Sequence, residues 1–137
     1  MGTILLATDG SEHARRAARR AVDEAAEREA TLHVLCVVDR RRMAEPALSA
    51  GELATIEAED HGHDAIALVR ELAAGTGVTV AGRTCHGVPH EEILDYAAEV
   101  DASVIVVGAH GEHDDHFGGV GRAVAAAADR EVLVVGE

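Results

Sequence analysis

Five glycines fall between residues 108 and 121, in a stretch that follows one apolar run and leads into an alanine-rich one. Phosphate groups need clustered backbone N–H donors and close backbone approach, and glycines at the start of a helix permit both. Glycine-rich turns also occur in loops that bind nothing, so the spacing alone leaves both interpretations open. The stretch is a candidate phosphate-binding loop, and its glycines are Gly108, Gly111, Gly118, Gly119 and Gly121.

Asp9 follows the first apolar run of the chain, in the turn Thr8-Asp9-Gly10. Its carboxylate is suited to accept hydrogen bonds from a ribose hydroxyl or to hold a metal beside phosphates. Turn acids and helix caps use the same residue type at such positions, and that interpretation stays open as well.

Three histidines, His110, His113 and His116, stand at intervals of three, with two aspartates between the last two. Imidazole and carboxylate groups at this spacing are compatible with binding a divalent metal ion. With nine histidines spread over the chain, loop histidines arise easily, so we predict no metal site here.

Motifs for catalysis are missing from the sequence. It has no Gly-x-Ser-x-Gly turn, no Walker motif and no lysine of any kind, which removes the usual cation of a phosphate loop. A response regulator needs an aspartate at the end of the third strand and a lysine on the fifth, whereas this chain has Cys85 and no lysine. The chain also has too few aromatic rings to stack on a flavin, because Tyr96 and Phe117 are the only ones.

Short apolar runs alternate with stretches of helical spacing along the chain, in the order βαβαβαβαβ. Such alternation predicts an α/β fold with a parallel sheet, helices on both faces and right-handed crossovers. The length of 137 residues fits one domain over residues 1–137. The predicted strands cover residues 4–7, 31–38, 78–85, 103–107 and 132–135, and the predicted helices begin near residues 11, 51, 89 and 121.

Ligands of such sheets bind outside the carboxyl ends of the strands, where the winding reverses. If the first and fourth strands are neighbours at this point, the turn at Asp9 and the loop that begins at Gly108 flank one crevice. The two candidate sites then become one.

Composition limits the partners and the compartment. The net charge of −13 comes from 25 acidic residues and 12 arginines, which opposes binding to nucleic acid or to an anionic membrane. Such self-repulsion is tolerated best where salt screens it, so we infer a halophilic cytoplasm as a hypothesis. The sequence has no apolar run long enough to cross a bilayer and no basic start of a signal peptide, which predicts a cytosolic protein. Cys36 and Cys85 lack any metal or disulfide spacing and are expected to be reduced packing residues.

Several segments together resemble the universal stress protein family, over essentially the whole chain. The most specific is Gly108-x2-Gly111-x9-Gly121, which has the spacing of the ATP-binding signature of that family. The others are residues 4–12, 35–39, 87–93 and 132–135, which resemble the opening strand and its aspartate turn, the end of the second strand, a Gly-x-Pro turn into a helix, and the closing strand.

The resemblance implies a Rossmann-like, doubly wound sheet of five parallel strands in the order 3-2-1-4-5. It also implies a homodimer through the fifth strand, Val132 to Val135, and in one branch an ATP, with or without Mg²⁺, between the first and fourth strand ends. By position in the family motif, the residues that would contact the base and ribose are Ala7, Thr8, Asp9 and Val37. Those that would line the sugar side are Val107 and Gly108. Those that would surround the phosphates are Gly111, Gly121, Arg122 and Ala123.

This chain departs from the family pattern beside the last glycine. The signature ends in glycine followed by Ser or Thr, whereas Arg122 follows Gly121 here. A guanidinium offers phosphates a charge-assisted contact, but its bulk is equally able to fill the pocket. Acidic residues between Gly111 and Phe117 would repel a triphosphate unless a cation intervenes.

Two functions are therefore expected from the resemblance. In the first, the protein binds ATP or a related adenine nucleotide as a regulatory ligand, with at most slow hydrolysis. In the alternative, it is a dimeric stress-response interaction protein that has lost nucleotide binding because Arg122 replaces the Ser or Thr.

Overall fold

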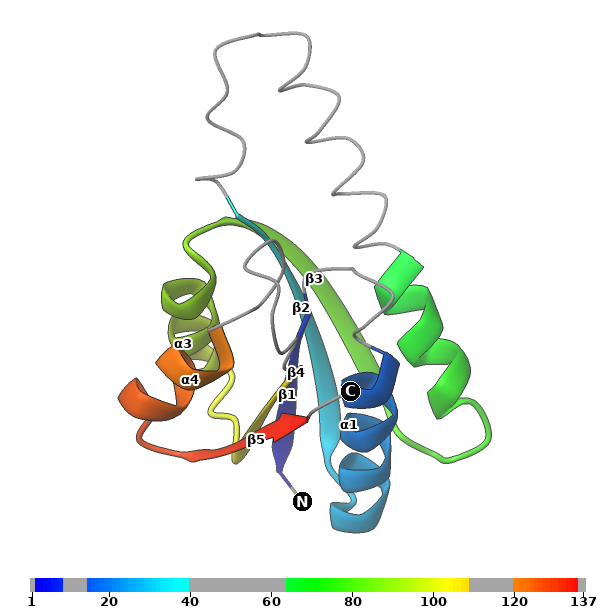
Figure 1. Ribbon diagram of the computed structural model, residues 1–137. Coiled ribbons are helices and arrows are strands. Elements are labelled where there is room, and N and C mark those ends of the chain that lie inside the picture. Colours follow the sequence, from blue (N-terminus) through cyan, green and yellow to red (C-terminus); the bar gives the residue numbers. More distant parts are fainter. Residues whose placement is uncertain (1, 9–14, 40–63, 109–119, 136–137) are drawn as a thin grey trace, which may run out of the picture.

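The computed structural model describes residues 2–8, 15–39, 64–108 and 120–135. In this part of the chain, five parallel strands form one sheet in the order β3-β2-β1-β4-β5 (Figure 1), which confirms the predicted order. The strands are β1 (Thr3–Thr8), β2 (Thr31–Asp39), β3 (Val80–Gly87), β4 (Val104–Gly108) and β5 (Glu131–Val135).

Helices cover both faces of the sheet, as predicted (Figure 1). Ile4 and Leu6 of β1 pack on the face that α1 (Arg15–Arg28) and the helix over residues 64–73 cover. Leu5 and Ala7 pack on the other face, against α3 (Pro89–Glu99) and α4 (Val120–Ala127). Because both faces are buried, β1 and β4 have no polar alternation and read as continuous apolar runs.

Strand β3 begins and ends two residues later than the sequence predicts. Gly75 and Gly77 have φ angles of 81° and 84°, a left-handed conformation that glycine adopts without a steric penalty. The Val78 N–H donates to Thr76 Oγ1 at 3.2 Å, so the chain is still in this turn at the predicted start of the strand. Pairing with β2 then runs from Val80 to Gly87, because β2 itself extends as far as Asp39.

Strand β1 lies at the point where the winding of the sheet reverses. From β1 the chain proceeds through β2 to β3 on one side, whereas β4 and β5 lie on the other side. Ala7, near the end of β1, pairs with Leu35 of β2 and with Val107 of β4. The carboxyl ends of β1 and β4 are therefore adjacent at the place where doubly wound sheets bind ligands.

Candidate functional site

Three strand ends form the floor of the candidate site. Ala7 and Val107 are paired and fully buried, and Gly108 follows as the last residue of β4. Thr8, which ends β1, is 2% exposed, and Val37 of β2 is also 2% exposed. The parallel register brings these residues, all predicted from the resemblance, to one edge of the sheet, which we call the carboxyl edge. Burial on both faces fixes their positions, so a ligand reaches them only from the strand ends.

Gly108 lies against the first described turn of α1. A Cβ built on Gly108 would lie 3.6 Å from Ala17 Cβ, which is an ordinary van der Waals distance. Packing against the described residues therefore does not require glycine here. The missing Cβ leaves the backbone of β4 open to close approach at the carboxyl edge.

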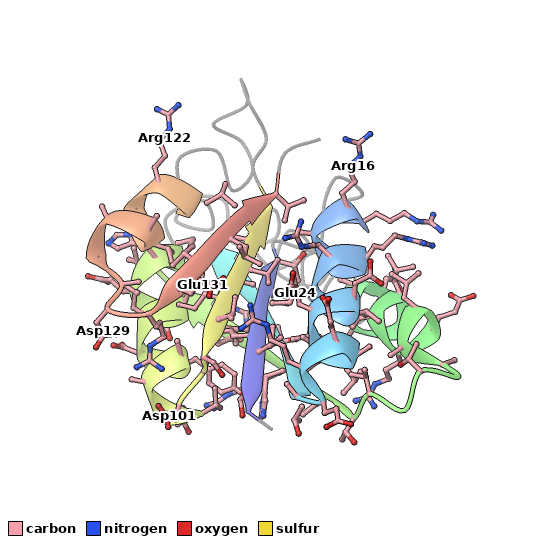
Figure 2. All side chains as sticks on the ribbon, turned by 90° about the horizontal axis from the view of Figure 1, so that it is seen from below. Arg16, Glu24, Asp101, Arg122, Asp129 and Glu131 are labelled. Carbon is pink, nitrogen blue, oxygen red and sulfur yellow. The ribbon has the colours of Figure 1, made fainter. Side chains whose placement is uncertain are left out.

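Helix α4 forms a wall of the candidate site, beside the floor of strand ends. Gly121, Arg122 and Ala123 lie in its first turn, and Val124 anchors the turn in the core with no exposed surface. Arg122 is exposed, and Figure 2 shows its side chain pointing past the strand ends, away from the sheet. No acidic residue occupies the first turn of α4. A cation at this end of a helix opposes the helix dipole, and a bound anion would relieve that repulsion.

Two predicted site residues, Asp9 and Gly111, lie outside the described residues. So do His110, His113 and His116, which were considered as metal ligands but for which no metal site was predicted. The structure therefore brings together Ala7, Thr8, Val37, Val107 and Gly108 as the floor, with the first turn of α4 at the same edge (Figure 2). Within the described ranges, no group of three or more His, Cys, Asp or Glu residues is arranged to hold a metal ion.

Arg16 is a residue at this edge that the sequence prediction missed. It lies in the first described turn of α1, is exposed, and points past the strand ends as Arg122 does (Figure 2). The sequence shows Arg16 beside inward-facing alanines. It does not show that α1 packs against the end of β4, and that contact brings Arg16 to the carboxyl edge.

A polar cluster on β2, β3 and α3 was also missed. A hydrogen bond of 3.1 Å joins His33 Nδ1 and the Tyr96 hydroxyl, and the Arg83 guanidinium lies 5.2 Å from the centre of the Tyr96 ring. Arg83 also lies 3.4 Å from the carboxylate of Glu99. These contacts link α3 to β2 and β3, and the cluster accounts for the single tyrosine of the chain as a packing residue.

Cys36 and Cys85 are not joined in a disulfide. Burial, aided by the negative charge of Glu92 and opposed by Arg83, raises the pKa of the Cys85 thiol to about 11. The thiol is therefore protonated at neutral pH and is a poor nucleophile.

No helix in the described part of the chain combines the length and apolarity needed to cross a bilayer.

The sequence pattern of the universal stress protein family matches residues 1–136. A universal stress protein of Methanocaldococcus jannaschii is 32% identical over 110 residues, which are 80% of this chain and 65% of that relative. The chain thus spans about two thirds of the length of this relative. A solved universal stress protein in complex with cAMP is 26% identical, with a TM-score of 0.75 over 98% of this chain and 96% of that one. The universal stress protein from Archaeoglobus fulgidus in complex with dAMP is also 26% identical, with a TM-score of 0.72 over 98% of both chains.

Proposed function

Because the chain belongs to the universal stress protein family, we propose that it binds ATP or a related adenine nucleotide as a regulatory ligand at the carboxyl edge. The observation that carries this proposal is the adjacency of the β1 and β4 ends at the reversal of winding. Two relatives in complex with adenine nucleotides, one with cAMP and one with dAMP, support it.

The proposed contacts follow the order of the site from floor to wall. Ala7, Thr8, Asp9 and Val37 contact the base and ribose, with Thr8 and Val37 held rigid by burial. Val107 and Gly108 line the sugar side. Gly111, Gly121, Arg122 and Ala123 surround the phosphates, where the exposed guanidinium of Arg122 donates to phosphate oxygens.

Regulation fits the residues of this edge better than rapid turnover does. The chain contains no lysine, so the usual cation of a phosphate-transferring loop has no counterpart in it. We propose ATP, with or without Mg²⁺, as the bound species and at most slow hydrolysis.

The alternative function is a dimeric interaction protein without a nucleotide, and one observation favours it. Arg122 is a long side chain where the family signature has a small hydroxyl residue, and it stands in the first turn of α4, which we propose as the phosphate end of the site. Under either function we propose one domain over residues 1–137 that forms a homodimer through Val132, Leu133, Val134 and Val135 of β5, in a salt-rich cytoplasm.

Calorimetric titration of nucleotide-free protein with ATP, AMP and adenosine at high salt tests the two functions. We expect wild-type protein to bind all three ligands. We expect Arg122→Ala to lower the affinity for ATP about fivefold, as for the loss of one exposed ion pair, and to have little effect on the affinity for adenosine. Arg20→Ala removes a charge that pairs with Glu24 on α1 and serves as the matched control.

Each outcome of the titration separates the functions. No heat and no melting shift at millimolar nucleotide would contradict nucleotide binding and favour the interaction protein. If Arg122→Ala lowered the affinities for ATP and adenosine equally, Arg122 would not contact the phosphates. If the variant bound ATP more tightly, the Arg122 side chain would be shown to obstruct the pocket.

A further inference from the structure

A groove lies at the edge of the sheet where the strands begin, which we call the amino edge. Its volume is about 410 Å³, within the range of roughly 300–1,000 Å³ that small-molecule sites occupy. The end of α1 with the start of β2 forms one side of it, and the turn before β3 forms the other. The length of the strands therefore separates this amino-edge groove from the candidate nucleotide site.

The floor of the groove is apolar and held in place. Ala25 has no exposed surface, Ala30 is buried, and Val78 packs against the same core. The turn beside them is fixed as well, because the Thr76 hydroxyl donates to the Ala73 carbonyl and accepts from the Val78 N–H. Small side chains on a fixed floor leave room for the hydrocarbon part of a ligand.

The charge at this edge favours a cation. Glu29 is the one charged residue of the lining and has no ion pair with any described residue. Helix α1 and the helix over residues 64–73 both end at the amino edge (Figure 1), and helix carboxyl termini carry partial negative charge. Arg28, the basic residue in the last turn of α1, is engaged with Glu24 and with Glu131 of β5.

Position, and not only the lack of an ion pair, distinguishes Glu29 from the other acids of α1. Glu27 also has no ion pair with a described residue, but it does not line the groove. Glu29 ends the helix with a φ of 55°, a conformation that glycine usually supplies at this place. The Ala30 N–H then donates to the Ala25 carbonyl at 2.9 Å. This bond fixes the backbone of Glu29 beside the apolar floor.

We propose that the amino-edge groove binds a small organic cation, an ammonium group carried on a short aliphatic chain. The ammonium lies against Glu29 and the helix ends, and the chain lies on the apolar floor. A bare metal ion fits less well, because one carboxylate supplies too few ligands, and the described residues include no group of three or more His, Cys, Asp or Glu that could hold one. The proposal is independent of nucleotide binding.

A titration that separates the charge of the ligand from its chain tests the proposal. Isotope-labelled protein is titrated, with amide shifts followed by NMR, at one fixed KCl concentration. The probes are butylammonium, methylammonium and butanol, which offer charge with chain, charge alone and chain alone. Wild-type protein is compared with Glu29→Gln, Ala26→Leu and Glu27→Gln. Ala26→Leu fills the groove from an exposed helical position, and Glu27→Gln removes the same charge from outside the lining.

We expect butylammonium to shift the amides of Ala30, Thr31 and Gly77 and to bind at least about fivefold more tightly than methylammonium, because each buried methylene contributes up to about fourfold. Glu29→Gln should weaken butylammonium about fivefold, as for one exposed ion pair, and bring it to the affinity of butanol. Ala26→Leu should remove the binding of both ligands. Glu27→Gln should change neither.

Three results would overturn the proposal. If butylammonium caused no saturable shift of the groove amides in wild-type protein, the groove would hold no amine. If Glu29→Gln and Glu27→Gln weakened binding equally, the attraction would be that of an acidic surface in general. Undiminished binding to folded Ala26→Leu would place the ligand elsewhere. Nucleotide binding, whether present or absent, enters none of these measurements.

Discussion

At the residue scale, Arg130 shows how a partly buried guanidinium differs from the exposed ones at the carboxyl edge. It precedes β5, and its Nη1 donates to the backbone oxygens of Ala97 and Ala102 at 3.0 and 2.8 Å. Its side chain is only 20% exposed. The two carbonyls lie at the end of α3 and just before β4, so one side chain fastens the start of β5 to the connection between those elements.

We expect Arg130→Ala to lower the free energy of unfolding by about 1–3 kcal/mol, because it leaves carbonyls of buried residues without a charged donor. Arg20→Ala, which removes an exposed pair four residues apart on α1, should cost less than about 0.5 kcal/mol. Urea unfolding followed by circular dichroism measures both. Equal midpoints for the two variants would show that the Arg130 contacts contribute no more than a surface pair.

At the element scale, β5 lies at one edge of the described sheet. It is an edge strand of five residues, paired with β4 on one side only. Val134 is 45% exposed and is the only large hydrophobic side chain of the described part that is exposed. An apolar edge strand with no pairing partner among the described residues on its outer side favours pairing with a second copy, which is the dimer proposed above.

Val134→Asp is expected to convert the dimer into a monomer of 14.3 kDa, because two carboxylates would face one another across a symmetric interface. Val134→Thr keeps the branched shape and should remain dimeric. Light scattering coupled to size exclusion measures the mass directly. A mass of one chain for the wild type, or an unchanged dimer in Val134→Asp, would rule out assembly through this strand.

At the scale of the whole molecule, net charge sets the conditions under which the fold is stable. The chain has 12 arginines and 25 acidic side chains. The ion pairs of the described residues are mostly exposed. Repulsion among the excess acids destabilises the compact state, and salt screens it.

We expect the unfolding temperature to rise between low and molar KCl, by about 4 °C for each kcal/mol gained in a chain of this length. Sucrose strengthens apolar burial without screening charges, so it should reproduce little of the increase. Differential scanning calorimetry measures both series. An unfolding temperature that does not depend on KCl would contradict the inference of a salt-rich cytoplasm.

The sequence predicts the sheet well because its physical signals are local and strong. Strands such as β4, buried on both faces, leave continuous apolar runs, and Pro89 with Glu91 and Glu92 marks the first turn of α3 where it is observed. Strand β3 was misplaced by two residues because its ends depend on pairing with β2 and on the turn at Gly75 and Gly77, and both are matters of three-dimensional contact.

The site is predictable only in part from the sequence. The floor residues, such as Ala7 and Gly108, follow from the strand ends and the glycine spacing. Arg16 does not, because no local signal reports that α1 packs beside β4. The cluster of His33, Arg83 and Tyr96 is likewise assembled from three elements far apart in the sequence.

The pairing of Val135 with Gly108 determines where a fused label would emerge. Any peptide attached beyond β5 leaves the sheet at the carboxyl edge, next to the candidate nucleotide site, and its charge or bulk would compete with a ligand. A peptide attached before Thr3 leaves from the opposite edge (Figure 1). Affinity tags and fluorophores for the nucleotide titrations therefore belong at the amino terminus, where they report on binding without taking part in it.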